Sequence, residues 1–202
     1  VEMGKGRSAG IEFMAQKTAG KTTGWLSYTL SKSDRKFTKG GINNGEWFPY
    51  KYDRRHSINL TINHKFSDRI DIGASWVFYT GGTSTIPEEK TTVIRPHNGA
   101  NNGFLWYGTY DNTNSSPTIG DVSYIEHRNN FRLPASHRLN LGVNFNKKTK
   151  HGMRTWNISL YNAYNAMNPA WVYRGHNKQG LSVIKKYTLL PLIPSFTYTY
   201  KF

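Results

Sequence analysis

Apolar and polar residues alternate with a period of two wherever the sequence is regular. In one such segment, Ile58, Leu60 and Ile62 are separated by single polar residues. Six segments follow this rule over their whole length, residues 11–16, 25–30, 57–65, 70–79, 138–145 and 156–160, and a seventh follows it over residues 196–202. Successive side chains of a β-strand point to opposite faces of its sheet, so this period predicts strands with one apolar and one polar face. No segment has a convincing helical period, and the predicted fold class is all-β and antiparallel.

This alternation argues against a helical membrane protein and is compatible with a transmembrane β-barrel. No apolar run approaches the roughly 20 residues that a transmembrane helix needs. The strands of a transmembrane β-barrel alternate in the same way and are never strongly apolar on average. The chain is also rich in aromatic residues, with 13 Tyr, 10 Phe and 6 Trp, which favour strands over helices.

The connections between the predicted strands alternate strictly between short and long. The short ones are residues 18–22, 67–69 and 147–152, and the long ones are residues 37–55, 81–136 and 169–180. An outer-membrane barrel has this asymmetry, with short periplasmic turns and long extracellular loops. The connections of a soluble sandwich mix hairpins and crossovers instead. The pattern therefore predicts a barrel in the bacterial outer membrane.

Aromatic residues gather at the ends of the predicted apolar faces, as at Trp76, Phe78, Trp156, Tyr198 and Tyr200. Tyr and Trp prefer the membrane interface because their rings are apolar while the OH or NH group stays hydrated. A soluble antiparallel sandwich with one packed face predicts the same alternation. It explains neither the aromatic ends nor the asymmetry of the connections.

The number of strands predicts the direction of the last one. If residues 181–202 form one unbroken strand, the seventh strand descends and ends in the periplasm, where the C-terminus of such a barrel lies. A hairpin at residues 191–194 would place Phe202 outside, so we expect Pro191 and Pro194 to mark bulges or an unpaired edge. Complete single-chain barrels have an even strand number of at least eight. We therefore expect residues 1–202 to be the C-terminal part of one larger barrel domain.

The charge points to an anionic partner, and the motifs do not point to catalysis. The formal net charge is +15, which suits the phosphates of lipopolysaccharide, although the rest of a longer protein could balance it. No nucleic-acid module, H-E-x-x-H motif or cysteine is present, so we predict no enzyme activity, cofactor, metal site or nucleic-acid partner. We expect Asp53, Arg54 and Arg55 to form salt bridges between a loop and the lumen side of the barrel. We expect His64 and His137 to lie at the membrane interface.

The chain resembles the C-terminal barrel region of TonB-dependent outer-membrane receptors, particularly those of Bacteroidetes. The motifs that carry the resemblance are residues 24–33 (GWLSYTLSKS), 52–60 (YDRRHSINL), 79–82 with 86–87 (YTGG, IP), 132–141 (RLPASHRLNL), 161–169 (YNAYNAMNP) and 191–202 (PLIPSFTYTYKF). Each motif is weak alone, but together they occur in order along nearly the whole chain.

The resemblance implies a barrel of about 22 strands that is occluded by a plug. It implies uptake of a bulky nutrient, such as a siderophore, cobalamin or a glycan, with TonB acting through the plug. The plug is not present in these residues. Outer-membrane lipid, lipopolysaccharide and a surface lipoprotein are further partners that this interpretation suggests.

The last strand also resembles the signal read by the barrel-assembly machinery, with Ser195, Thr197, Tyr200 and Phe202 at the pattern positions and Thr197 where Gly is commoner. Such a strand pairs as an edge before the barrel closes.

The long loops contain aromatic residues that could stack on a ligand, on each other or on a partner. The candidates are Trp47, Tyr50, Trp106, Tyr107 and Tyr110, with Phe48 in the same loop as the first two. Two other functions remain open: a small complete barrel that acts as an adhesin or structural protein, and a soluble basic β-sandwich that binds anionic glycans.

Overall fold

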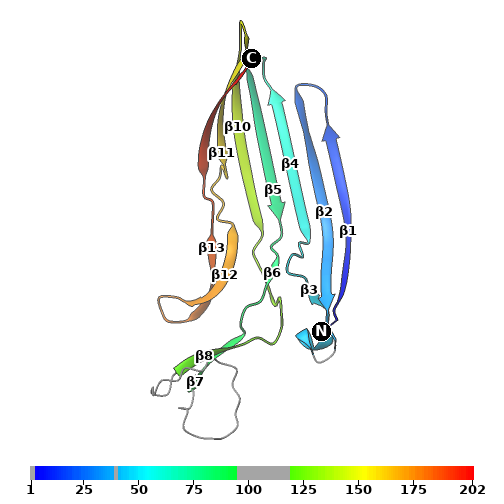
Figure 1. Cartoon of the computed structure of the whole chain (residues 1–202), viewed down its shortest axis with the longest axis vertical. Coiled ribbons are helices and arrows are strands. Elements are labelled where there is room, and N and C mark those ends of the chain that lie inside the picture. The colour runs from blue at the N-terminus through cyan, green and yellow to red at the C-terminus, as the bar shows by residue number, and fades with distance from the viewer. Residues whose placement is uncertain (1–2, 39–40, 95–118) are drawn as a thin grey trace. The chain divides into compact units, whose positions relative to one another are not determined.

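A computed structural model describes residues 3–38, 41–94 and 119–202, and it divides into two units. The larger unit comprises Val1–Ile86 and His127–Phe202, and the smaller one Pro87–Glu126. The larger unit is dominated by seven long strands: β1 (Lys5–Lys17), β2 (Thr22–Lys36), β4 (His56–Lys65), β5 (Ile70–Tyr79), β10 (Ser136–Thr149), β11 (Gly152–Tyr161) and β14 (Ile193–Lys201). They form one sheet in the order β1-β2-β4-β5-β10-β11-β14, and every neighbouring pair is antiparallel (Figure 1). The predicted all-β antiparallel class is confirmed.

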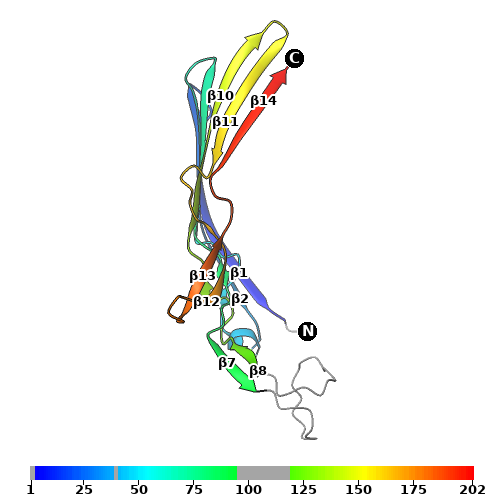
Figure 2. The same ribbon diagram turned by 90° about the vertical axis from the view of Figure 1, so that its left-hand side faces the viewer.

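The sheet of the larger unit is a single curved layer (Figure 2). Within the described residues, the only buried large apolar side chains are Phe48 and Ile86. Neither lies in one of the seven long strands. The part of the sheet that these strands form therefore has no conventional hydrophobic core on either face.

Short connections join the long strands at one end of the sheet, which we name the turn end (Figure 1). They are residues 18–21, 66–69 and 150–151. Gly20 has a φ of 92°, a backbone conformation that suits glycine in a tight turn. The connections at the opposite loop end are residues 37–55, 80–135 and 162–192. The predicted alternation of short and long connections is confirmed.

The long connections contain structure of their own. The first holds the 3₁₀ turn η1 (Ile42–Gly45) and β3 (Phe48–Pro49), which pairs with β2. In the second, β6 (Thr83–Ser84) pairs with β9 (Phe131–Arg132). The smaller unit contributes the hairpin of β7 (Glu89–Ile94) and β8 (Ile119–Tyr124). The third holds β12 (Pro169–His176) paired with β13 (Ser182–Thr188).

The prediction of one unbroken strand over residues 181–202 is wrong, as is the prediction of a loop over residues 169–180. β13 pairs with β12 in a separate hairpin, and β14 pairs with β11 after an interruption at residues 189–192. Pro191 has no N–H group for a ladder, and Leu190 has a φ of 58°. β13 and β14 are not paired with each other, so the prediction that the prolines form no hairpin is confirmed.

Asn162 holds this interruption in place. Its residue is 1% exposed and its φ is 54°. The side-chain amide donates to the carbonyl oxygens of Ala166 at 3.0 Å and Leu190 at 3.2 Å, and its oxygen accepts the N–H of Ala166 at 2.8 Å. One side chain thus satisfies backbone groups on both sides of the β12–β13 hairpin.

We expect Asn162→Ala to destabilise this region more than Asn162→Gly does. Both variants lose three hydrogen bonds, each worth about 1 kcal/mol. Only alanine also meets the left-handed backbone penalty of about 1–2 kcal/mol. Hydrogen exchange of residues 162–168 and 189–193 would measure the difference, and equal effects of the two variants would contradict this account.

Candidate functional site

The cross-strand register brings the apolar residues of all seven strands onto one face of the sheet. Ile62, for example, lies opposite Ala74, which lies opposite Leu141, which lies opposite Leu160. The face comprises Ile11, Phe13, Ala15, Leu26, Tyr28, Leu30, Ile58, Leu60, Ile62, Ile70, Ile72, Ala74, Trp76, Phe78, Leu139, Leu141, Val143, Phe145, Trp156, Ile158, Leu160, Pro194, Phe196, Tyr198 and Tyr200. We name this set the apolar face.

The apolar face is exposed rather than packed. Phe13 is 57% exposed, Ile158 is 49% exposed and Phe196 is 65% exposed. No second layer covers the apolar face within the described residues of the larger unit. Exposed apolar surface of this extent marks a membrane contact, a protein interface or a ligand site.

The opposite face is polar and linked by hydrogen bonds. Asp71 accepts hydrogen bonds at 2.7 Å from the side-chain amides of both Asn144 and Asn146. Asn144 accepts the amide of Asn157 at 2.7 Å, and Asn146 accepts the hydroxyl of Thr155 at the same distance. The network joins β5, β10 and β11 near the turn end. These side chains are satisfied without the need for a packed partner.

Aromatic and histidine side chains cluster near the loop end of the apolar face. Tyr164 accepts a hydrogen bond from the Trp76 indole at 3.1 Å, and its hydroxyl lies 2.8 Å from Nδ1 of His137. On neighbouring strands, the hydroxyl of Tyr28 lies 2.9 Å from Nδ1 of His56. The polar atoms of these rings are therefore paired at the edge of the apolar region.

A second aromatic group lies toward the turn end. The ring of Trp156 lies 5.1 Å from that of Phe196 and 4.5 Å from that of Tyr198. Also toward the turn end, but on β4, His64 packs against Phe66 and its Nδ1 lies 2.7 Å from the Thr22 hydroxyl. Aliphatic residues fill the centre of the face between the two aromatic groups.

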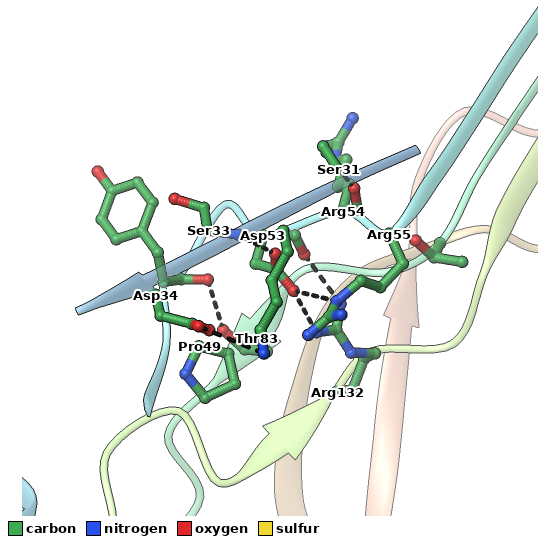
Figure 3. A network of polar contacts seen from close by, with 12 residues as sticks. Ser31, Ser33, Asp34, Pro49, Asp53, Arg54, Arg55, Thr83 and Arg132 are labelled. Carbon is green, nitrogen blue, oxygen red and sulfur yellow. Dashed lines mark hydrogen bonds and ion pairs between the residues drawn. The ribbon is translucent and has the colours of Figure 1, made fainter. Parts of the chain in front are cut away.

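Asp53 is the centre of a polar junction at the loop end (Figure 3). It is 1% exposed and accepts the backbone N–H of Ser33 at 2.6 Å, Arg55 Nε at 3.2 Å and Arg132 Nη2 at 2.5 Å. Nη1 of Arg132 donates to the carbonyl oxygens of Asp53 and Gly81, both at 2.9 Å. This loop-end junction ties β2 to the first and second long connections. Arg132 had no predicted partner, and only the folded chain reveals its pairing.

The environment of Asp53 lowers its pKa. Burial alone would raise the pKa, but hydrogen bonds from Arg132, Ser33 N–H and Arg55, together with the charge of Arg55, outweigh it. The predicted ion pairing of Asp53 is thus observed, between Asp53 and Arg55 and between Asp53 and Arg132. Arg54 instead lies over the ring of Tyr79, 4.0 Å from its centroid.

We expect acid to open the loop-end junction. Because the folded pKa is lowered, the carboxylate stabilises the folded junction fully above the unfolded value of about 3.9. This stabilisation is lost as the pH falls through the folded pKa. Hydrogen exchange of residues 50–55 and 131–133 between pH 8 and pH 2, corrected for intrinsic exchange, would show increased opening at acid pH. A change centred near neutral pH would contradict this assignment.

Of the predicted ligand residues, the structure describes Trp47 and Tyr50, and these two lie apart. Arg7, whose side chain leaves β1 on the apolar-face side, lies 4.3 Å from the ring centroid of Trp47. Arg35, on the opposite side of β2, lies 4.2 Å from that of Tyr50. The two aromatic residues therefore contact opposite sides of the sheet. Trp106, Tyr107 and Tyr110 lie outside the described residues.

The predicted assembly residues also divide between the two faces. Alternation along β14 places Ser195 and Thr197 on the polar face, and Tyr200 on the apolar face. Phe202, just beyond the strand, is fully exposed. Within the described sheet β14 pairs only with β11, so it is an edge strand.

Among the described residues, no helix is both long enough and apolar enough to cross a membrane. Comparison of the chain with models of protein families, with curated proteins and with solved structures finds no match.

Proposed function

We propose that the chain forms part of the wall of a bacterial outer-membrane β-barrel, with the apolar face toward lipid and the polar face toward the lumen. The observation that carries this proposal is the apolar face, which is continuous over seven strands and uncovered in the described larger unit. A water-soluble sheet must bury such a face against another layer. In a barrel wall, the lipid replaces that layer.

The height of the apolar face suits a membrane. On β5 it runs from Ile70 to Phe78, about 26 Å at a rise of roughly 3.3 Å per residue. With the usual strand tilt of about 40°, this corresponds to roughly 20 Å along the membrane normal, close to the apolar band of about 25 Å in known barrels. The aromatic groups near each end supply the remaining interfacial contacts.

Charged residues on the same side of the sheet lie beyond the two ends of the apolar face. Alternation places Arg7 and Lys32 at the loop end, and Lys17, Lys147 and Arg154 at the turn end. Basic side chains are favoured where lipid phosphates lie. In the proposed barrel, the short turns face the periplasm. Lys201, which lies opposite Met153 at the turn end, faces the periplasm as well.

The proposed parent is a TonB-dependent transporter for a bulky nutrient, with these residues as the C-terminal part of its barrel. The support is the ordered set of motifs and the open sheet, in which β1 and β14 each pair on one side only among the described strands. A closed barrel requires further strands. The genomic reading frame ahead of Val1 tests this class: a plug domain there would support it, and a signal peptide directly before Val1 would contradict it.

Membrane insertion is tested separately by folding the full chain in phosphatidylcholine vesicles. We expect strand formation that depends on lipid, but without the heat-modifiable migration on SDS gels of a closed barrel, because β1 and β14 leave open edges among the described strands and only a closed sheet satisfies every backbone group in lipid. A monomeric, folded and soluble chain without detergent or lipid would contradict the barrel proposal and favour a β-sandwich. Heat-modifiable migration on SDS gels, together with a complete barrel that this chain closes by itself, would favour the small complete barrel.

A further inference from the structure

A basic cluster lies at the loop end of β1 and β2, on the same side of the sheet as the apolar face. The register places Lys5 opposite Lys36, Arg7 opposite Asp34, and Ala9 opposite Lys32. The next pair on this side is Ile11 and Leu30, which belong to the apolar face. We name Lys5, Arg7, Lys32 and Lys36 the basic cluster.

The basic cluster carries more positive than negative charge. Arg7 Nη2 lies 2.9 Å from the Asp34 carboxylate, and Lys32 Nζ lies 3.5 Å from the same oxygen. Asp34 is the only carboxylate that the described residues place in ion-pair contact with the four cations. Like charges directly opposite each other on neighbouring strands are destabilising, so a bound anion would stabilise the pair formed by Lys5 and Lys36.

The surroundings of the cluster suit an anion that carries an apolar tail. The side chains of Arg7 and Lys32 are 55% and 51% exposed. Trp47 lies against Arg7 and is itself 38% exposed, as suits an aromatic residue at a membrane interface. Lys32 lies two residues beyond Leu30, and Arg7 lies four residues beyond Ile11. These spacings place the two cations about 7–14 Å along the strands from the apolar face, which is the level of lipid headgroups.

We propose that the basic cluster binds the phosphate groups of an anionic lipid in the outer leaflet, while the lipid's acyl chains lie on the neighbouring apolar face. This inference rests on the proposed barrel function. It adds a specific lipid site to a surface that would otherwise contact lipid without preference.

The test uses the full chain in maltoside micelles, with diphosphorylated lipid A as the probe and native mass spectrometry as the measurement. We expect bound lipid A, and little binding of its dephosphorylated form. The triple variant Lys5→Gln, Lys32→Gln, Lys36→Gln keeps the Arg7–Asp34 pair, and we expect about a hundredfold weaker binding, since each basic residue near anionic lipid contributes about fivefold.

A matched control changes three exposed lysines elsewhere at the loop end: Lys51→Gln, Lys178→Gln, Lys185→Gln. We expect its binding to equal that of the unchanged chain. If the triple variant does not fold, the single variants of Lys5, Lys32 and Lys36 should each weaken binding by about fivefold.

Equal binding by the basic-cluster and control variants would overturn the lipid site, as would equal binding of lipid A with and without phosphates. Competition by inorganic phosphate alone would assign the cluster to a free anion and would also overturn it. These failures leave the barrel proposal intact if the chain still inserts into vesicles. A folded, monomeric and soluble chain that needs neither detergent nor lipid would instead reject the barrel proposal itself.

Discussion

Replacing Ile62 by arginine is expected to abolish stable insertion of the chain into lipid vesicles. Ile62 lies near the middle of the apolar face, opposite Gly24 on one side and Ala74 on the other. It is 40% exposed, so the longer side chain meets little steric hindrance within the sheet. An arginine on the lipid face at the membrane midplane costs about 2–4 kcal/mol. The measurement is the unfolding free energy in vesicles, from urea titration.

Asn63→Arg is the matched control for Ile62→Arg. Asn63 is the next residue along β4, points to the polar face and lies opposite Thr23 and Gly73. In a hydrated lumen its arginine should leave the unfolding free energy almost unchanged. The barrel proposal fails if the two variants have equal effects, or if Ile62→Arg makes the chain more soluble and leaves its fold intact in water.

Replacing Asp53 by asparagine is expected to open the loop-end junction. The change leaves the guanidinium groups of Arg132 and Arg55 without their shared carboxylate. Loss of one partner of a buried pair costs 3–5 kcal/mol, and we expect about 2–4 kcal/mol here because the side chain of Arg132 is 33% exposed and solvent screens its charge. Hydrogen exchange of residues 50–55, 81–83 and 131–133 would measure this loss as more frequent local opening.

The control for Asp53→Asn is Asp68→Asn. Asp68 lies in a short turn and pairs with Lys65 at 2.8 Å, but both side chains are largely exposed, and such surface pairs contribute little. Asp68→Asn should leave the exchange of the loop-end junction unchanged. Unchanged exchange in Asp53→Asn as well would mean that the backbone bonds of Arg132 and the β6–β9 pairing hold the junction without the carboxylate.

The sequence by itself determined the strands and their two faces. Side chains alternate along any extended backbone, so Ile58, Leu60 and Ile62 are assigned to one face without knowledge of their neighbours. The short turns were likewise predictable from the local sequence, as at Gly20. The extent of the last strand was mispredicted because the count of strands, and not alternation, extended it from residues 196–202 back to residue 181, and neither signal reveals whether a strand pairs with β11 or with β12.

The tertiary structure alone decided which residues meet. Asp53 and Arg132 lie 79 positions apart, and nothing in either local sequence specifies the other as its partner. The same holds for Trp47 and Tyr50, which are close in sequence but contact opposite sides of the sheet through Arg7 and Arg35. Period-two patterning assigns each side chain to a face, whereas register and the path of the long connections determine its neighbours across the sheet.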